Sequence, residues 1–536
     1  MKKLLILFLI GFLFLSFPNS VQADTTYYRD GTPYQTYTVD FEGELTPTQT
    51  AYRPVGVFNR DRVLNAPADV HIANELVYVA DAMNKRIAVF DFSGVLIQTI
   101  THPDFSNPLG VFADQDAIYV ADKGAQTVFK FALDGTFIRL FTKPTEPLFG
   151  SNSVFVPTKI AVGRGENIYV ISDGSTSGVI QLNYDGSFLG YFGVNLSSKP
   201  FLQRLADLVV ITDQYAKTTP PSPTNIAINE QSLVYTATPL TDQALKKLDI
   251  NGNNILTAAN YNATQNVVDL TVDARGYLYA IYDDGLVVEY DPDGNLLFAF
   301  NILQANLEIL GLVMVPSGIA VDALGYIYVT DQLKNRIVVL EPTEFNRLVH
   351  RAIDAYNEGG YVESKLLFEF VTRQNANFAL AHSALGKAYY QEGLIEQARD
   401  EYRLANDRSG YSEAFWKLRD QWLKDNLSVV FTVILVGMVL VGVLKQVSKR
   451  TLVFQPIQAK VKTWGEHPIV RQYTLVFQML KRPIHSFYEI KRTKRASVVS
   501  ATVLLVLLFL LYLAMKMGVG RSEEHTSELQ SPNTIS

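Results

Sequence analysis

The feature that most constrains the fold is a strand-rich pattern that recurs between residues 64 and 342. Each copy has a tyrosine inside a short apolar, β-branched run, most clearly at residues 77–81, 118–122 and 327–331. The marker tyrosines of the six copies are Tyr78, Tyr119, Tyr169, Tyr235, Tyr279 and Tyr328. A strand-rich period of 40–50 residues is typical of propeller blades rather than of a sandwich.

Turn signals separate the strands of the copies, as in Asp134-Gly135, Asp185-Gly186 and Asp293-Gly294. One four-stranded unit cannot bury both of its faces, so we expect the copies to pack side by side around an axis. The pattern resembles the NHL repeat, and this resemblance implies a mainly β fold with a six-bladed β-propeller over residues 24–342.

Two parts of the repeat are irregular. The acid that follows the tyrosine strand shifts by one place in copies three and five, to Asp173 and Asp283, and copy four lacks it. Residues 25–62, including 34–39, are expected to supply an outer strand that closes the ring, because closure removes exposed strand edges.

The repeated acids Asp81, Asp122 and Asp331 are candidates for chemistry. They could line a metal or carboxylate site, but an Asp that recurs at one place in successive blades is more simply a turn residue that bonds to its own backbone. His71 and His102 are isolated, and no phosphate loop, nucleophile elbow or spaced His/carboxylate cluster is present. We therefore expect no catalytic, metal-binding or cofactor-binding residues, and no cofactor.

A long interval precedes Tyr235 and contains Lys217, Thr218 and Thr219 followed by a proline-rich run. Long loops on a rigid scaffold often carry binding residues, so these three residues form the candidate ligand loop. The alternative is a surface loop without a binding role.

After Pro342 the apolar period changes from two to about 3.6, which predicts helices over residues 343–426. Leu385, Gly386 and Gly393 belong to a spacing that resembles the tetratricopeptide repeat, and a weaker copy with Gly359 lies 34 residues earlier. A generic helical hairpin is the alternative. Small residues in this pattern let paired helices approach closely while aromatic residues fill the space between them.

Three apolar segments indicate a membrane protein. Residues 1–23 have the charge, apolar run and small-residue ending of a signal peptide, although an uncleaved anchor is the alternative. Residues 427–444 and 496–515 are free of charge and long enough to span a bilayer, so we expect at least two transmembrane helices. A buried helix of a soluble protein is the alternative for each.

The charge of the chain is divided. Residues 445–495 contain 12 Lys/Arg and 2 acids, whereas the part before them is strongly acidic, since the whole chain carries −6. A basic loop between two spans marks the cytoplasmic side, which places residues 24–426 outside the cell membrane. An acidic exterior argues against nucleic acid as a partner, because phosphate binding needs clustered Lys and Arg.

The end of the chain has two resemblances. Residues 480–492, followed by the second span, are similar to the opening of a Yip family membrane domain, for which an amphipathic juxtamembrane helix is the alternative. Residues 521–531 resemble the translation of a sequencing adaptor, so we expect 521–536 to be an artefact, with a native polar tail as the alternative. The total absence of cysteine excludes disulfides, Cys-ligated metals and thiol catalysis.

Together these features predict a membrane-anchored, extracytoplasmic binding or scaffold protein of a bacterial type. Its partners are expected to be proteins or peptides, including components of membrane transport. Two alternatives stay open: a propeller enzyme of the lyase or lactonase kind, and an accessory subunit of a membrane transporter.

Overall fold

The computed structural model describes residues 31–58, 63–194, 222–239, 241, 243–256, 266–304 and 309–450, and single positions or short runs among 482–512. Several sequence predictions lie outside the described residues: the signal peptide at 1–23, the candidate ligand loop with Lys217, Thr218 and Thr219, and the adaptor-like tail at 521–536. Most of the basic loop at 445–495, most of the Yip-like segment at 480–492 and part of the predicted second span at 496–515 lie outside them as well.

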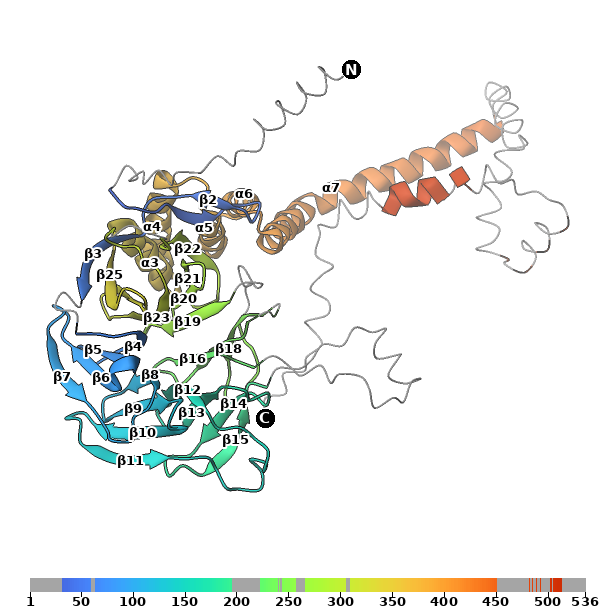
Figure 1. Ribbon diagram of the computed structural model, residues 1–536. Coiled ribbons are helices and arrows are strands. Elements are labelled where there is room, and N and C mark those ends of the chain that lie inside the picture. Colours follow the sequence, from blue (N-terminus) through green and yellow to red (C-terminus); the bar gives the residue numbers. More distant parts are fainter. Residues whose placement is uncertain are drawn as a thin grey trace, which may run out of the picture. The chain divides into compact units, whose positions relative to one another are not determined.

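Six separate antiparallel sheets form the first part of the chain, and they are the blades of a six-bladed β-propeller (Figure 1). Blade one contains β4 (Pro67–Ala73), β5 (Leu76–Asp81), β6 (Arg86–Phe90) and β7 (Leu96–Ile100), with the 3-10 turn η1 (Ala82–Asn84) between β5 and β6. Blade two contains β8 (Pro108–Ala113), β9 (Ala117–Asp122), β10 (Thr127–Ala132) and β11 (Phe137–Phe141). Blade three contains β12 (Pro157–Val162), β13 (Ile168–Ser172), β14 (Val179–Leu182) and β15 (Phe188–Phe192).

The remaining blades depart from the simple four-stranded plan. Blade four has three described strands, β16 (Asn225–Ile228), β17 (Val234–Ala237) and β18 (Leu245–Leu248). Blade five contains β19 (Val267–Val272), β20 (Leu278–Tyr282), β21 (Leu286–Tyr290) and β22 (Leu296–Asn301), extended by β1 (Thr36–Val39) and β2 (Leu45–Pro47). Blade six contains β23 (Pro316–Val321), β24 (Ile327–Asp331), β25 (Arg336–Pro342) and β3 (Tyr52–Phe58).

The marker tyrosines lie at equivalent places in the six blades. Each is on the second strand of its blade, and each is at most 8% exposed. These strands are buried on both faces because each sheet packs between two neighbours, which explains their continuous apolar runs. The innermost strands contact one another in order, and β23 contacts β4, so the ring is closed.

The ring is closed by a different segment from the one that the sequence pattern emphasised. Strand β3 pairs with β25 from Phe58↔Ile337 to Tyr52↔Pro342, so an N-terminal strand completes the last blade. The expectation of a closing strand within residues 25–62 is thus confirmed. Strand β1, however, pairs with β22 and extends blade five, so residues 34–39 do not close the ring.

Two helical hairpins follow β25. The first is α3 (Glu344–Asn357) with α4 (Tyr361–Gln374), and the second is α5 (Ala379–Gln391) with α6 (Ile395–Leu404). Gly359 and Gly393 occupy equivalent turns with φ of 85° and 80°, a backbone conformation that glycine adopts easily. A Cβ at Gly386 would lie 2.6 Å from the Tyr402 ring, so this glycine lets α5 and α6 approach closely, as predicted.

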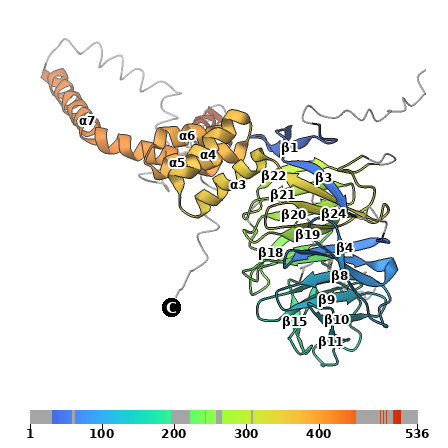
Figure 2. The same ribbon diagram turned by 90° about the vertical axis from the view of Figure 1, so that its left-hand side faces the viewer.

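Helix α3 is joined to the propeller by buried polar contacts. The Glu289 carboxylate on β21 accepts hydrogen bonds from the Tyr52 hydroxyl (2.9 Å) and the Asn346 amide (3.0 Å), and it pairs with His350 Nε2. The His350 ring stacks on Tyr277 at 4.1 Å between ring centroids. The chain forms two compact units, 1–380 and 381–536, so α3 and α4 belong to the same unit as the propeller (Figure 2).

The second unit contains a long helix, α7 (Arg408–Arg450). Its part up to Leu444 is long and apolar enough to cross a membrane, with a mean hydropathy of 2.9 in the most apolar window, none of which is buried. It includes the predicted span at 427–444. It is the one such helix among the described residues, so the structure does not show the predicted second span at 496–515.

Candidate functional site

Two places in the propeller bring polar or aromatic side chains together: the axis of the ring and a groove between two blades. At the axis, one register position of the six innermost strands holds Asp69, Gly110, Lys159, Asn225, Asp269 and Gly318. The glycines are required by packing, since a Cβ at Gly110 would lie 2.6 Å from the Thr158 carbonyl oxygen. The other four positions carry polar side chains toward the axis.

Lys159 links two carboxylates across the axis. Its Nζ donates to Asp69 Oδ1 at 2.5 Å and to Asp269 Oδ1 at 2.9 Å, and all three side chains are largely buried. Asp69 Oδ2 accepts the Val111 backbone N–H (2.9 Å), and Asp269 Oδ2 accepts the Ile319 N–H (2.8 Å). The axial ion pairs therefore join blades one, three and five directly, and blades two and six through their backbones.

Burial shifts the titration of the groups at the axis. Burial, and secondarily the charge of Asp69, raises the pKa of Asp269 to about 6, although Lys159 opposes this shift. Burial alone would lower the pKa of Lys159, but the two carboxylates together raise it. His71 lies beside them, and burial lowers its pKa to about 4 despite its contact with the Ala113 carbonyl oxygen (3.0 Å).

The space at the axis is small. The cavity lined by Asp69, His71, Lys159 and Asp269 has a volume of about 50 Å³. Ligand pockets typically measure about 300–1,000 Å³, so this cavity has room for a few water molecules rather than for an organic substrate or cofactor. Its charged groups already bond to one another, and their arrangement fits a structural role in holding the blades together.

The predicted turn acids lie away from this axial cavity. Asp81, Asp122 and Asp331 end the second strands of their blades and are completely buried. Their carboxylates accept backbone N–H groups of the preceding loop, such as Asn65 N to Asp81 (2.7 Å) and Met314 N to Asp331 (3.0 Å). Each of the three acids therefore binds the loop that precedes its blade to the end of the second strand of that blade.

His102 also has a packing environment. Its ring lies against the aromatic side chains of blade two, at 5.0 Å from Phe129 and 4.7 Å from Phe137 between centroids. Among the described residues, no group of three or more His, Asp or Glu side chains is arranged to hold a metal ion.

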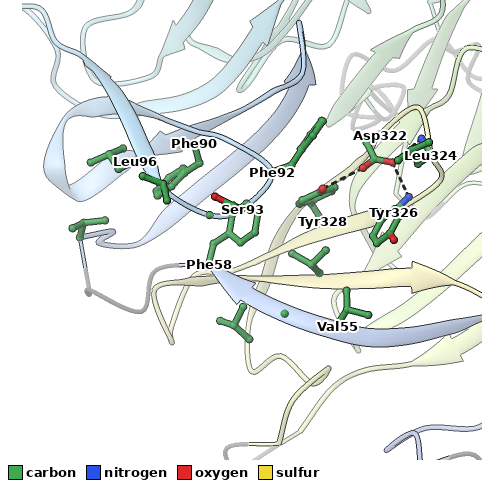
Figure 3. A pocket seen from close by; sticks show the side chains of 16 residues that line it. Val55, Phe58, Phe90, Phe92, Ser93, Leu96, Asp322, Leu324, Tyr326 and Tyr328 are labelled. Carbon is green, nitrogen blue, oxygen red and sulfur yellow. Dashed lines mark hydrogen bonds between the residues drawn. The ribbon is translucent and has the colours of Figure 1, made fainter.

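The larger space is a groove between blades six and one, with a volume of about 780 Å³ (Figure 3). We call it the 6/1 groove. Residues 55–58 of β3, Phe90, residues 92–96 of the β6–β7 hairpin, and Val339 line it, together with Val63. The β23–β24 hairpin of blade six adds four alternate residues: Asp322, Leu324, Tyr326 and Tyr328.

Aromatic rings from both blades meet in the 6/1 groove. The Tyr328 ring lies 5.7 Å from Phe58 and 6.1 Å from Phe92 between centroids, and Phe58 lies 6.1 Å from Phe90 (Figure 3). Phe92 is 41% exposed, whereas Tyr328, Phe58 and Phe90 are buried. The groove is thus lined by three buried aromatic rings and by one ring, that of Phe92, which is accessible to solvent.

Asp322 is the single charged residue among the described residues that line the 6/1 groove. It is buried, and its Oδ1 accepts the Leu324 and Tyr326 backbone N–H groups at 2.9 Å each. Its Oδ2 accepts the Tyr328 hydroxyl at 3.2 Å. Burial, and then the charge of Asp322, raises the pKa of Tyr328, so this tyrosine stays neutral and donates to the carboxylate.

The sequence pattern did not reveal either place. Asp69, Lys159 and Asp269 stand at about the same offset before their marker tyrosines, which is the signal that could have shown a common axial position. The 6/1 groove depends on the pairing of β3 with β25, which joins distant parts of the chain.

The comparisons with known proteins find similarity to solved structures and no match in sequence. No family model matches the chain, and no curated protein matches it. A streptogramin B lyase structure is similar at 12% identity and a TM-score of 0.37, covering 54% of this chain and 97% of that one.

Two further solved structures are similar at the same level. Hydrazine synthase of Kuenenia stuttgartiensis has 10% identity and a TM-score of 0.35, covering 53% of this chain and 97% of that one. A catalytically inactive variant of virginiamycin B lyase from Staphylococcus aureus, with quinupristin, has 13% identity and a TM-score of 0.34, with coverages of 59% and 94%. Similarity of this degree supports no transfer of function. The tetratricopeptide and Yip resemblances remain predictions from the sequence.

Proposed function

We propose that this chain is a membrane-anchored binding or scaffold protein, whose propeller and helical hairpins recognise a partner outside the cell membrane. The observation that carries the proposal is α7, a helix with a mean hydropathy of 2.9 whose most apolar window is entirely unburied. An apolar helix without protein cover is stable in a bilayer, where lipid replaces the missing neighbours.

The orientation in this proposal comes from charge. Residues 445–495, which follow the predicted span, are strongly basic, and such segments stay on the cytoplasmic side. The propeller and the helical hairpins precede the span, so one crossing places them on the opposite side. The proposed signal peptide leads to the same orientation.

Recognition rather than turnover is proposed because of how the polar groups are arranged. The charged groups at the axis bond to each other in a space of about 50 Å³, whereas the 6/1 groove offers about 780 Å³ and an exposed aromatic ring. That volume lies within the range of ligand sites. The 6/1 groove is therefore the proposed ligand site.

Helix α4 supplies the proposed contact for a protein partner. Val362, Leu366 and Phe370 follow one another at intervals of four residues, so they share one face of the helix. They are 64%, 51% and 51% exposed. Apolar side chains that are exposed together on a helix face are typical of protein interaction sites.

Alkaline extraction of membranes from cells that express the full chain tests the proposal. We expect the chain to stay with the lipid pellet at high pH, as integral proteins do. The matched variant Val436→Arg with Leu440→Arg places two charges in the middle of the proposed span, where each costs about 2.5–3.5 kcal/mol, and should reduce membrane retention. Full recovery of the unmodified chain in the soluble fraction would refute a membrane anchor.

A further inference from the structure

The composition of the 6/1 groove indicates which kind of ligand it suits. Its described lining contains five aromatic side chains and one carboxylate, and no lysine or arginine. Aromatic faces carry negative electrostatic potential and attract organic cations whose centres lie within about 6 Å of the ring centroid. An anion would find no compensating charge in this lining.

The exposed ring of the groove is positioned by its neighbour. Phe92 from blade one and Tyr328 from blade six lie 6.1 Å apart, and Figure 3 shows these two rings side by side. Phe92 is exposed enough to turn a face toward a bound group, and Tyr326 stands on the same side as Asp322. A methylated ammonium group, which is large and weakly hydrated, makes favourable contact with several ring faces at once.

Asp322 supplies the matching charge. Its carboxylate is held by two backbone N–H groups and by the Tyr328 hydroxyl, so it is fixed in position before any ligand binds. The acidic composition of the part of the chain before residue 445 attracts cations from a distance as well. Glu341, which accepts the Tyr326 hydroxyl, is already paired with Arg347 at 3.4 Å and contributes less.

We propose that the 6/1 groove binds a small quaternary ammonium compound, with its methylated head against Phe92, the exposed ring of the groove, and its charge near Asp322. This assignment rests on the proposed binding function and names its ligand class. A volume of about 780 Å³ accommodates such a head together with an attached polar or aliphatic group.

Binding of choline to the purified full-length chain in lipid nanodiscs tests this proposal, with isothermal titration calorimetry as the measurement. The control ligand is 3,3-dimethyl-1-butanol, which has the shape of choline without its charge. We expect choline to bind and the neutral isostere to bind at least roughly tenfold more weakly, because cation–aromatic attraction and the Asp322 charge both require the cation.

Two variants locate the binding in the groove. Phe92→Leu keeps an apolar side chain without the ring and should weaken choline binding roughly fivefold. Its control is Phe137→Leu in blade two, since Phe137 is also 41% exposed. Asp322→Asn should weaken binding roughly tenfold. Its control is Asp291→Asn, because Asp291 is equally buried and caps an equivalent turn through the Asp293 and Asn295 N–H groups.

The possible outcomes separate this proposal from the proposed function. Equal affinity for choline and its neutral isostere, an absence of choline binding, or equal losses in the Phe92 and Phe137 variants would each overturn it. Binding of a trimethyl-lysine peptide without binding of choline would also overturn it, because the ligand would then be a protein. Thermal unfolding of each variant shows whether it folds, and Phe92→Leu tests the groove even if Asp322→Asn is unstable. Alkaline extraction tests the membrane anchor, and its outcome does not depend on any of these binding results.

Discussion

At the scale of single residues, the most consequential arrangement is the charge balance at the axis. Lys159 is the one cation that the described structure places between Asp69 and Asp269, and these carboxylates come from blades one and five of the ring. Removing one partner of a buried ion pair leaves an uncompensated charge, which costs more than the pair itself contributes. The identity of residue 159 is therefore critical for the stability of the ring.

Replacing Lys159 with Met should destabilise the propeller by about 3–5 kcal/mol, because two carboxylates lose their shared cation while remaining buried. Urea unfolding of the detergent-solubilised chain, followed by near-ultraviolet circular dichroism, measures the loss. The control is Lys130→Met, since Lys130 is half-buried and lies over the Tyr119 ring at 5.2 Å without a buried ion pair. Equal effects of the two substitutions would contradict the account of the axis.

The pH dependence of stability should reveal two opposing groups at the axis. The folded pKa of Asp269, about 6, lies above its ordinary 3.8, so its contribution to the free energy of unfolding decreases as pH rises between those values. The folded pKa of His71, about 4, lies below its ordinary 6.5, so its contribution increases over nearly the same interval. The two slopes partly cancel in the unmodified chain.

Asp269→Asn removes the contribution to the free energy of unfolding that decreases with rising pH. It leaves the contribution of His71, which increases with rising pH. The free energy of unfolding should then rise more steeply from about pH 4 to pH 6.5 than it does in the unmodified chain. Urea unfolding at a series of pH values gives both slopes. An unchanged or shallower slope in the variant would show that Asp269 does not retain its proton in the folded ring.

At the scale of elements, the propeller and the first helical hairpin are joined through β3 and α3. Glu289 accepts hydrogen bonds from Tyr52 of β3 and Asn346 of α3, so one buried carboxylate connects the closing strand to the helix. Glu289 is fully buried, whereas Glu344 in the first turn of α3 is highly exposed and pairs with Arg347. This contrast gives a matched pair of substitutions.

Glu289→Ala should destabilise the unit by about 3–5 kcal/mol, because it leaves the Tyr52, Asn346 and His350 donors buried without their acceptor. Glu344→Ala should change stability by about 0.5 kcal/mol or less, as expected for an exposed pair. Hydrogen exchange followed by mass spectrometry should show faster exchange in both β3 and α3 in the Glu289 variant. Faster exchange in α3 without a change in β3 would disprove the coupling of the two elements.

Local sequence signals predicted the second strand of each blade. The features that they did not predict depend on pairing between residues that are far apart in the chain. The six second strands could be predicted because each marker tyrosine is surrounded by its own apolar run. The role of β3 could not, because it depends on pairing between residues 52–58 and 336–342. Likewise, Lys159 is 90 and 110 positions from its partners Asp69 and Asp269, so the three residues meet only once the ring is closed.

At the scale of the whole molecule, charge divides the chain into an acidic first part and a basic segment after residue 444. The structure describes one helix between them that is long and apolar enough to cross a membrane. The sequence predicted this one apolar helix because hydropathy acts over a whole segment and needs no knowledge of pairing, whereas the second span that it predicted at 496–515 is not shown among the described residues. The groove and the axial ion pairs required the folded ring.

The most direct test of the central proposal uses the absence of cysteine from the chain. Single cysteines at Thr142, an exposed position of the propeller, and at Thr463 in the basic segment are labelled in spheroplasts with a membrane-impermeant maleimide. We predict labelling of the Thr142→Cys chain in intact spheroplasts, and labelling of Thr463→Cys only after permeabilisation. Labelling of Thr463→Cys in intact spheroplasts while Thr142→Cys stays protected would contradict the proposed orientation.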